Sequence, residues 1–202
     1  PERRLRWVES WGSTKETEGS AGLTQTAVDF HIETRGGSTV VRLVHSGFST
    51  SADWDEYYDA TVAGWTYFLW NLAFYVVRHF GIARRMISER RRTTRSVEDV
   101  WSELMGPSGL AVQGLETLAA GDRLACTVGD RGFAGDVHYV RYPRNMAGTL
   151  VELNDGLLFV EMEPSYGEAW SCGVWISAYG VDTEETEALQ AQLTALADQV
   201  FG

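Results

Sequence analysis

Two histidines stand where an imidazole could take part in acid–base chemistry. His138 lies in Asp136-Val-His-Tyr-Val140, where Asp136 or Tyr142 could exchange a proton with it. His45 precedes Ser46, but a nucleophilic triad also needs an orienting acid, and the Gly-x-Ser-x-Gly turn of many hydrolases is absent. We therefore predict no catalytic residue, and the pattern favours a protein that is not an enzyme.

The motifs of metal, redox and nucleotide chemistry are absent as well. The chain has no His-Glu-x-x-His, no Cys-x-x-Cys, no phosphate-binding glycine loop and no Gly-x-Gly-x-x-Gly, and it contains only four histidines. Cys126 and Cys172 lack metal-ligand spacing and are interpreted as buried thiols in a reducing compartment, with a disulfide as the alternative. We expect no metal and no cofactor.

The charge of the chain narrows the choice of partners. A formal net charge of -11 over 202 residues argues against a general nucleic-acid binder, which needs an excess of Lys and Arg. The one basic cluster is interpreted as a solvated linker or edge strand, or alternatively as an anion or acidic-partner site; it comprises Arg84, Arg85, Arg90, Arg91, Arg92 and Arg95. The apolar run at 67–77 contains Asn71 and is shorter than the ~18 to 20 residues of a membrane helix. We expect a cytoplasmic protein that binds neither nucleic acid nor membrane.

A β-hairpin is the clearest element of the first half. Apolar and polar residues alternate from Val28 to Glu33, a second strand is predicted over Thr39–His45, and Gly36-Gly37 between them supplies the positive φ angles of a two-residue turn. This turn fixes the register, which places Ile32, Phe30 and Val28 opposite Val41, Leu43 and His45. One face of the hairpin is therefore apolar except for His45, which is either a ligand-orienting group or a hydrogen-bonded core histidine.

A long helix over 51–80 follows, and it is apolar on two sides. Thr50 and Asp53 have capping-box spacing at its start. One stripe, which includes Trp65, Leu69 and Leu72, is expected to cover the hairpin sheet. With Phe68 and with Phe30, Leu43 and His45 of the sheet, these residues form the predicted ligand-binding set. The second stripe must also be buried and is predicted to be a seam between domains; it consists of Tyr67, Trp70, Phe74 and Val77.

The second half has its own order of elements. A capping box at Ser96-Val-Glu-Asp99 predicts a short helix, strands are predicted at 122–128, 133–142, 149–153, 157–163 and 169–179, and a final helix is predicted over 183–201. We thus expect two domains, over 1–82 and 96–202, joined by the Arg-rich segment 83–95. The fold class is α+β, with antiparallel sheets and long helices.

Part of the chain resembles a known family. Thr39-Val-Val-Arg-Leu-Val-His-Ser-Gly-Phe48, Trp54-Asp-Glu-Tyr-Tyr58 and Gly64-Trp65 are similar to the Hsp90 ATPase activator homologue (AHSA1-type) family of the START-like, SRPBCC superfamily. The resemblance implies a helix-grip fold, in which an antiparallel sheet wraps a long C-terminal helix around a cavity. It also implies that 1–82 is the C-terminal part of a first such domain, and that 96–202 is a second, divergent copy.

Three functions are compatible with these observations. The leading hypothesis is a binding protein with a hydrophobic cavity for an apolar or amphipathic small molecule. An Hsp90-activator-like or other protein-interaction module is the first alternative, since the second helix stripe could meet a protein partner. A polyketide-cyclase-like or hydrolytic enzyme is the second alternative, and fold analogy alone does not decide among the three.

Overall fold

The computed structural model describes residues 3–11, 24–48, 55–164 and 169–201. The chain divides into two compact units, Pro1–Tyr58 and Asp59–Gly202.

The first unit is a three-stranded antiparallel sheet with the order β1-β2-β3, formed by β1 (Arg3–Trp11), β2 (Thr24–Arg35) and β3 (Ser38–Ser46). Gly36 and Gly37 make the turn with φ angles of 56° and 82°, which residues with a Cβ rarely adopt. Phe30 lies opposite Leu43 and Val28 lies opposite His45, so the predicted register is confirmed.

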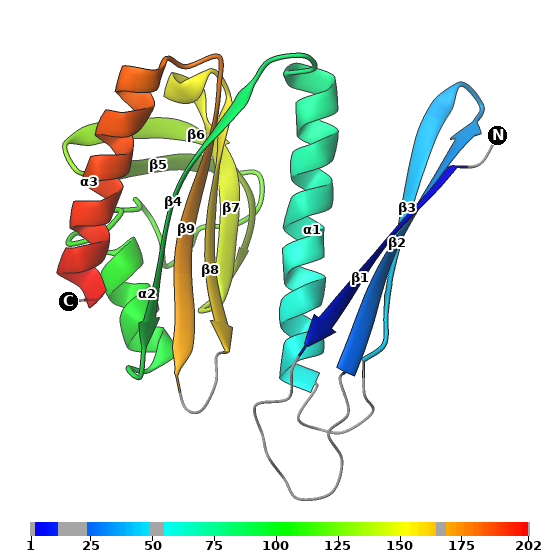
Figure 1. The fold of residues 1–202 in the computed structure, drawn as a ribbon. Coiled ribbons are helices and arrows are strands. Elements are labelled where there is room, and N and C mark those ends of the chain that lie inside the picture. The colour runs from blue at the N-terminus through cyan, green and yellow to red at the C-terminus, as the bar shows by residue number, and fades with distance from the viewer. Residues whose placement is uncertain (1–2, 12–23, 49–54, 165–168, 202) are drawn as a thin grey trace, which may run out of the picture. The chain divides into compact units, whose positions relative to one another are not determined.

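The second unit contains a six-stranded antiparallel sheet with the order β4-β9-β8-β7-β6-β5. Its strands are β4 (Arg84–Thr93), β5 (Arg123–Val128), β6 (Arg131–Arg141), β7 (Asn145–Leu150), β8 (Gly156–Pro164) and β9 (Trp170–Tyr179). The Arg-rich segment is thus an edge strand, one of its two predicted interpretations. Figure 1 shows that the sheet lies between α3 (Thr183–Phe201) on one face and α1 (Asp55–Arg78) on the other.

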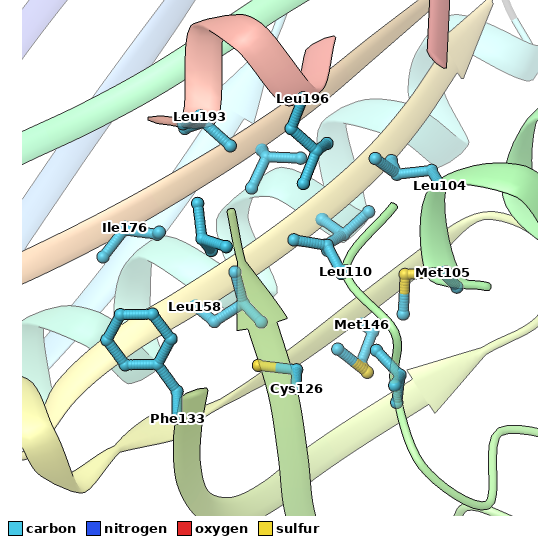
Figure 2. Packing of buried hydrophobic residues seen from close by; sticks show 14 of the residues in the cluster. Leu104, Met105, Leu110, Cys126, Phe133, Met146, Leu158, Ile176, Leu193 and Leu196 are labelled. Carbon is cyan, nitrogen blue, oxygen red and sulfur yellow. The ribbon is translucent and has the colours of Figure 1, made fainter. Parts of the chain in front are cut away.

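The main core lies on the face that α3 covers. Alternate residues of the strands, such as Leu158 and Ile176, point toward this helix and toward α2 (Val97–Met105). Leu193 and Leu196 meet them from the helix side (Figure 2). This arrangement of an antiparallel sheet on a long C-terminal helix agrees with the predicted α+β, helix-grip fold.

Local sequence signals define both helices of this core. The Ser96 hydroxyl accepts a hydrogen bond from the Asp99 backbone N–H at 3.1 Å, which caps α2 as predicted. Asp182 caps α3 by accepting from the Glu185 N–H at 2.8 Å. Cys126 and Cys172 are free and buried, as expected.

The helix α1 packs on the other face of the same sheet. Phe159 of β8 alternates with Leu158 and therefore points away from α3, where it meets Tyr67 of α1. Because of this packing, residues from Asp59 onward group with the second unit, whereas the predicted domain boundary was near residue 82. The helix ends at Arg78 rather than Phe80, since the chain turns at His79–Ile82. Its predicted start at 51 and the Thr50–Asp53 cap lie outside the described residues.

The prediction of a strand over 149–153 was wrong. The strand β7 runs over Asn145–Leu150, and Val151–Leu153 forms a 3-10 turn instead. Thr149-Leu-Val-Glu-Leu has the higher intrinsic β propensity. Asn145–Thr149 nevertheless forms the strand because β7 lies between β6 and β8 and pairs with both.

We expect Gly135→Ala to destabilise the second unit strongly, whereas Gly132→Ala on the same strand does not. A Cβ at Gly135 would lie 1.8 Å from the Thr149 carbonyl oxygen, whereas a Cβ at Gly132 meets nothing within 4 Å. Overpacking of this kind costs ~1 to 3 kcal/mol or more. Urea unfolding followed by tryptophan fluorescence measures the difference, and equal unfolding midpoints for the two variants would contradict the packing of β6 on β7.

Candidate functional site

Aromatic stacking joins α1 to the six-stranded sheet. Three pairs of rings lie nearly parallel, with interplanar angles of 7° to 8° and centroid distances of 3.9 to 4.1 Å; they are Tyr67 with Phe159, Trp70 with His138, and His79 with Tyr179. Such pairs contribute ~0.5 to 1.5 kcal/mol each beyond the burial of their surface. The pairs extend along the helix to its C-terminal end and therefore fix its position on the sheet.

A buried polar network lies among these rings. The Tyr179 hydroxyl donates to Oδ1 of Asn71 at 3.1 Å, and Nδ2 of Asn71 donates to the Tyr67 hydroxyl at 3.3 Å. Burial raises the pKa of Tyr67 to about 12, and it also raises the pKa of Tyr179. Both phenols therefore stay protonated at neutral pH.

The turn after β7 holds the C-terminal end of α1. Arg78 forms an ion pair with Asp155 at 2.7 Å, and Nε2 of His79 is 3.2 Å from the Asp155 carbonyl oxygen. Asn154 donates from Nδ2 to the Tyr179 carbonyl oxygen at 3.1 Å. The same turn thus contacts both the helix and β9.

A pocket of about 260 Å³ opens between α1 and the β4–β9 edge of the sheet. The apolar side chains of its lining, Phe68 and Leu72, belong to α1. Its polar side chains include Asn71 and Tyr179 of the buried network and Arg84 of β4. It is lined by Phe68, Asn71, Leu72, Tyr75, Arg84 and Tyr179, all of which belong to the second unit. An apolar cleft with a few convergent polar groups is typical of small-molecule sites.

Arg84 differs from three other arginines of the basic cluster in its charged contacts. Arg90, Arg91 and Arg95 form ion pairs with Glu163, Asp198 and Glu103. Within the described residues Arg84 forms no ion pair, and its guanidinium contacts the Met86 sulfur at 3.7 Å. Its positive charge acts on both Tyr67 and Tyr179. Of the six arginines of the basic cluster, Arg84 is the one that lines the pocket.

The structure brings together only part of the predicted ligand-binding set. Phe68 and Leu72 line the pocket, whereas Trp65 and Leu69 are half-buried and do not line it. Phe30, Leu43 and His45 belong to the first unit. A shared site of these three residues with α1 stays a prediction.

His45 has neighbours within the first unit. Its ring centroid is 4.7 Å from that of Phe48. Burial lowers the pKa of His45, and the charge of Glu9 partly offsets this effect. A neutral imidazole on an apolar face is compatible with both of its predicted roles.

The residues of the predicted seam have different surroundings. Tyr67 is 2% exposed, and Trp70 and Phe74 are half-buried, but Val77 is 81% exposed. Val77 lies about 120° around the helix from Asn71, whose side chain is buried, so it points away from the network. Tyr67 and Trp70 are covered by residues of β8 and β6 in the same chain.

The structure does not bring the predicted acid–base partners to His138. The His138 ring stacks on Trp70, and burial lowers its pKa. Asp136 forms an ion pair with Arg123 at 2.5 Å, and Tyr142 is exposed beside the Trp101 ring. Both possible partners are thus engaged elsewhere.

A second polar group is buried on the α1 side of the sheet. Glu161 is 5% exposed and lies opposite Asn145 in the β7–β8 register. Burial raises the pKa of Glu161 to about 9, with a further contribution from the charge of Glu163 and a hydrogen bond to it. Glu161 is therefore a neutral acid at pH 7, and it donates to the carboxylate that pairs with Arg90.

Sequence reasoning missed most of the pocket's polar residues. Asn71 interrupts an apolar run four residues after Tyr67, and this spacing is the signal that could have identified it, because a buried amide needs partners. Arg84 could not be separated from the other arginines of its cluster. Tyr179 is the last residue of a buried strand and carries no signal of its own.

No family model matches the chain, and no curated protein matches it either. Similar solved structures include DynU16 from the dynemicin biosynthetic locus (TM-score 0.46, 14% identity, 57% of this chain and 45% of that chain). They also include the Aha1 dimer from Colwellia psychrerythraea (0.45, 12%, 55% and 90%). A third is the AHSA1-like protein from Aeromonas hydrophila (0.38, 15%, 56% and 88%), which carries the name of the family that the sequence resembles. The match thus spans less than half of DynU16.

The described residues were also compared with the requirements of a metal site and of a membrane-spanning helix. Within the part of the chain that the structure describes, no three His, Cys, Asp or Glu side chains converge as metal ligands would. None of the helices in that part combines the length and hydropathy that are required to cross a bilayer.

We expect Glu161→Gln to flatten the pH dependence of stability. Between about pH 4.5 and pH 9 the folded protein holds a proton on Glu161 that the unfolded chain has released. The contribution of this group to the free energy of unfolding is therefore fully present below about pH 4.5 and is lost as the pH rises to about 9. Glutamine stays neutral and can still donate to Glu163. The variant should therefore gain ~1 to 3 kcal/mol over the parent at pH 9.

The measurement is urea unfolding at several pH values between 4.5 and 9. Glu116→Gln, at an exposed position, is the matched control and should follow the parent. Parallel pH profiles for the parent and for Glu161→Gln would show that Glu161 is not held as a neutral acid.

Proposed function

We propose that this protein binds an apolar or amphipathic small molecule in the pocket between α1 and the β4–β9 edge. The proposal is supported by a lining that combines apolar and polar side chains. Phe68 and Leu72 are apolar, and Asn71 and Tyr179 are polar and hydrogen-bonded to each other. Apolar walls supply affinity and a few fixed polar groups supply orientation in sites of this kind.

The pocket is pre-formed rather than dependent on a ligand. Tyr179 is fixed on one side by the His79 ring and on the other by its hydrogen bond to Asn71. Asn71 is fixed in turn by its bond to Tyr67, which stacks on Phe159. A ligand therefore meets side chains that have already lost their freedom, and this reduces the entropic cost of binding.

The size of the pocket limits the ligand. A cavity of about 150 Å³ holds benzene, and pockets for drug-sized molecules begin at roughly 300 Å³. At about 260 Å³, this pocket suits a molecule with one or two rings or a short aliphatic chain.

The two alternative functions lack a comparable observation. The protein-interaction hypothesis rested on the stripe of Tyr67, Trp70, Phe74 and Val77, but Tyr67 and Trp70 already pack on the sheet of the same chain. The enzyme hypothesis rested on fold analogy, with His45 and His138 as its candidate residues. Asp136 and Tyr142 have other partners than His138.

We expect Leu72→Trp to abolish ligand binding without loss of stability. Leu72 lines the pocket but is 43% exposed, so an indole at this position fills the pocket while leaving the core intact. Val76→Trp is the matched control, because Val76 is 52% exposed on the same helix and does not line the pocket. Both variants are screened against a library of one-ring and two-ring compounds by thermal shift and ligand-detected NMR.

The parent and Val76→Trp should give the same hits, and Leu72→Trp should give none of them. If no compound binds the parent, or if every hit binds Leu72→Trp with the parent's affinity, the pocket is not the ligand site.

A further inference from the structure

We infer that the ligand of this pocket is a small aromatic anion whose carboxylate or similar oxyanion pairs with Arg84. This inference rests on the proposed function and adds the chemical class of the ligand. Its basis is that Arg84, which has no acidic partner among the described residues, lines a pocket together with the aromatic side chains of Phe68, Tyr75 and Tyr179.

Among the described residues, no carboxylate neutralises the charge of Arg84. The chain has eleven more acidic than basic charges, and carboxylates neutralise three arginines of β4 and of the segment that follows it. The guanidinium of Arg84 instead contacts the Met86 sulfur, and its charge acts on the protonated phenols of Tyr67 and Tyr179. Asp155, in the turn that contacts the C-terminal end of α1, is already paired with Arg78. The guanidinium is thus available for an anion that enters from solvent.

The polar floor favours a ligand that accepts hydrogen bonds. The Tyr179 hydrogen is used by Asn71, and one Nδ2 hydrogen of Asn71 is used by Tyr67. The second Nδ2 hydrogen of Asn71 and the five N–H groups of Arg84 are all donors. A carboxylate matches the guanidinium geometrically, because the two can form a pair of parallel hydrogen bonds.

The walls of the pocket favour a flat ligand. Tyr75 and Tyr179 have ring centroids 6.0 Å apart and an interplanar angle of 31°, and Phe68 adds a third ring to the lining. Offset stacking and edge contacts with such rings favour an aromatic ligand over an aliphatic chain of the same size. A volume of about 260 Å³ then admits one or two fused rings.

The test compares 2-naphthoate with 2-naphthylmethanol, which has the same rings but no charge. Binding of each is measured by titration NMR at pH 7 in low salt, with the intact chain. The parent should bind 2-naphthoate about five- to tenfold more tightly, as expected for a partly exposed charge-assisted pair. Raising the salt concentration should weaken only the binding of 2-naphthoate.

The variant Arg84→Gln should lose this preference and retain the affinity for 2-naphthylmethanol. Arg85→Gln is the matched control, because Arg85 carries the same charge one residue later, donates to the Val181 carbonyl oxygen and does not line the pocket. It should retain the parent's preference.

The possible failures are distinguishable. If the parent binds both compounds equally, or if Arg85→Gln loses the preference as Arg84→Gln does, the pocket binds small molecules but the inference about anions is wrong. If neither compound binds the parent although other compounds of the library do, only the inference is wrong. If no compound of the library binds the parent, or if both naphthyl compounds bind Leu72→Trp with unchanged affinity, the proposed function fails and the inference fails with it.

Discussion

The aromatic face of α1 cannot stay in water, and the outer face of the six-stranded sheet is the surface that buries it. Tyr67 is nearly inaccessible against Phe159, and Trp70 and His79 meet rings at two other places on the sheet. Each large side chain that is fully buried contributes ~1.5 to 3 kcal/mol. The helix is therefore a second layer on the domain that contains α3, and the site depends on this packing.

The stacked rings also explain why the pocket has a polar floor. Asn71 lies among the rings, where an amide without partners would cost ~1 to 3 kcal/mol, and Tyr67 and Tyr179 supply both of its hydrogen bonds. Asn71 and Tyr179 of this network line the pocket together with the apolar side chains of Phe68 and Leu72. Arg84 then adds a cation at the point where the edge strand begins. The pocket is thus lined by residues of the packed helix, by members of the buried hydrogen-bond network and by an arginine of the edge strand.

Local signals in the sequence predicted most elements but not their assembly. The hairpin register followed from Gly36-Gly37 and alternating side chains, and the cap at Ser96 followed from Asp99 three residues later. Periodicity also identified two apolar sides of α1, but it shows which residues need burial and not what buries them. The long-range pairs, such as Trp70 with His138, were therefore missed, and so were the pocket residues Tyr179 and Arg84. The position of β7 was missed for the same reason, since pairing on both sides overrides a low local propensity.

These ring pairs hold α1 on the six-stranded sheet, and NMR distances in solution can detect them. Trp70 and His138 have ring centroids 4.1 Å apart, although they are far apart in the sequence. The account predicts strong nuclear Overhauser effects between their ring protons, and also between the Asn71 side-chain amide and the Tyr179 ring, in the intact chain in solution. If these contacts are absent while α1 remains helical, the helix does not pack on this sheet and the account of the site is wrong.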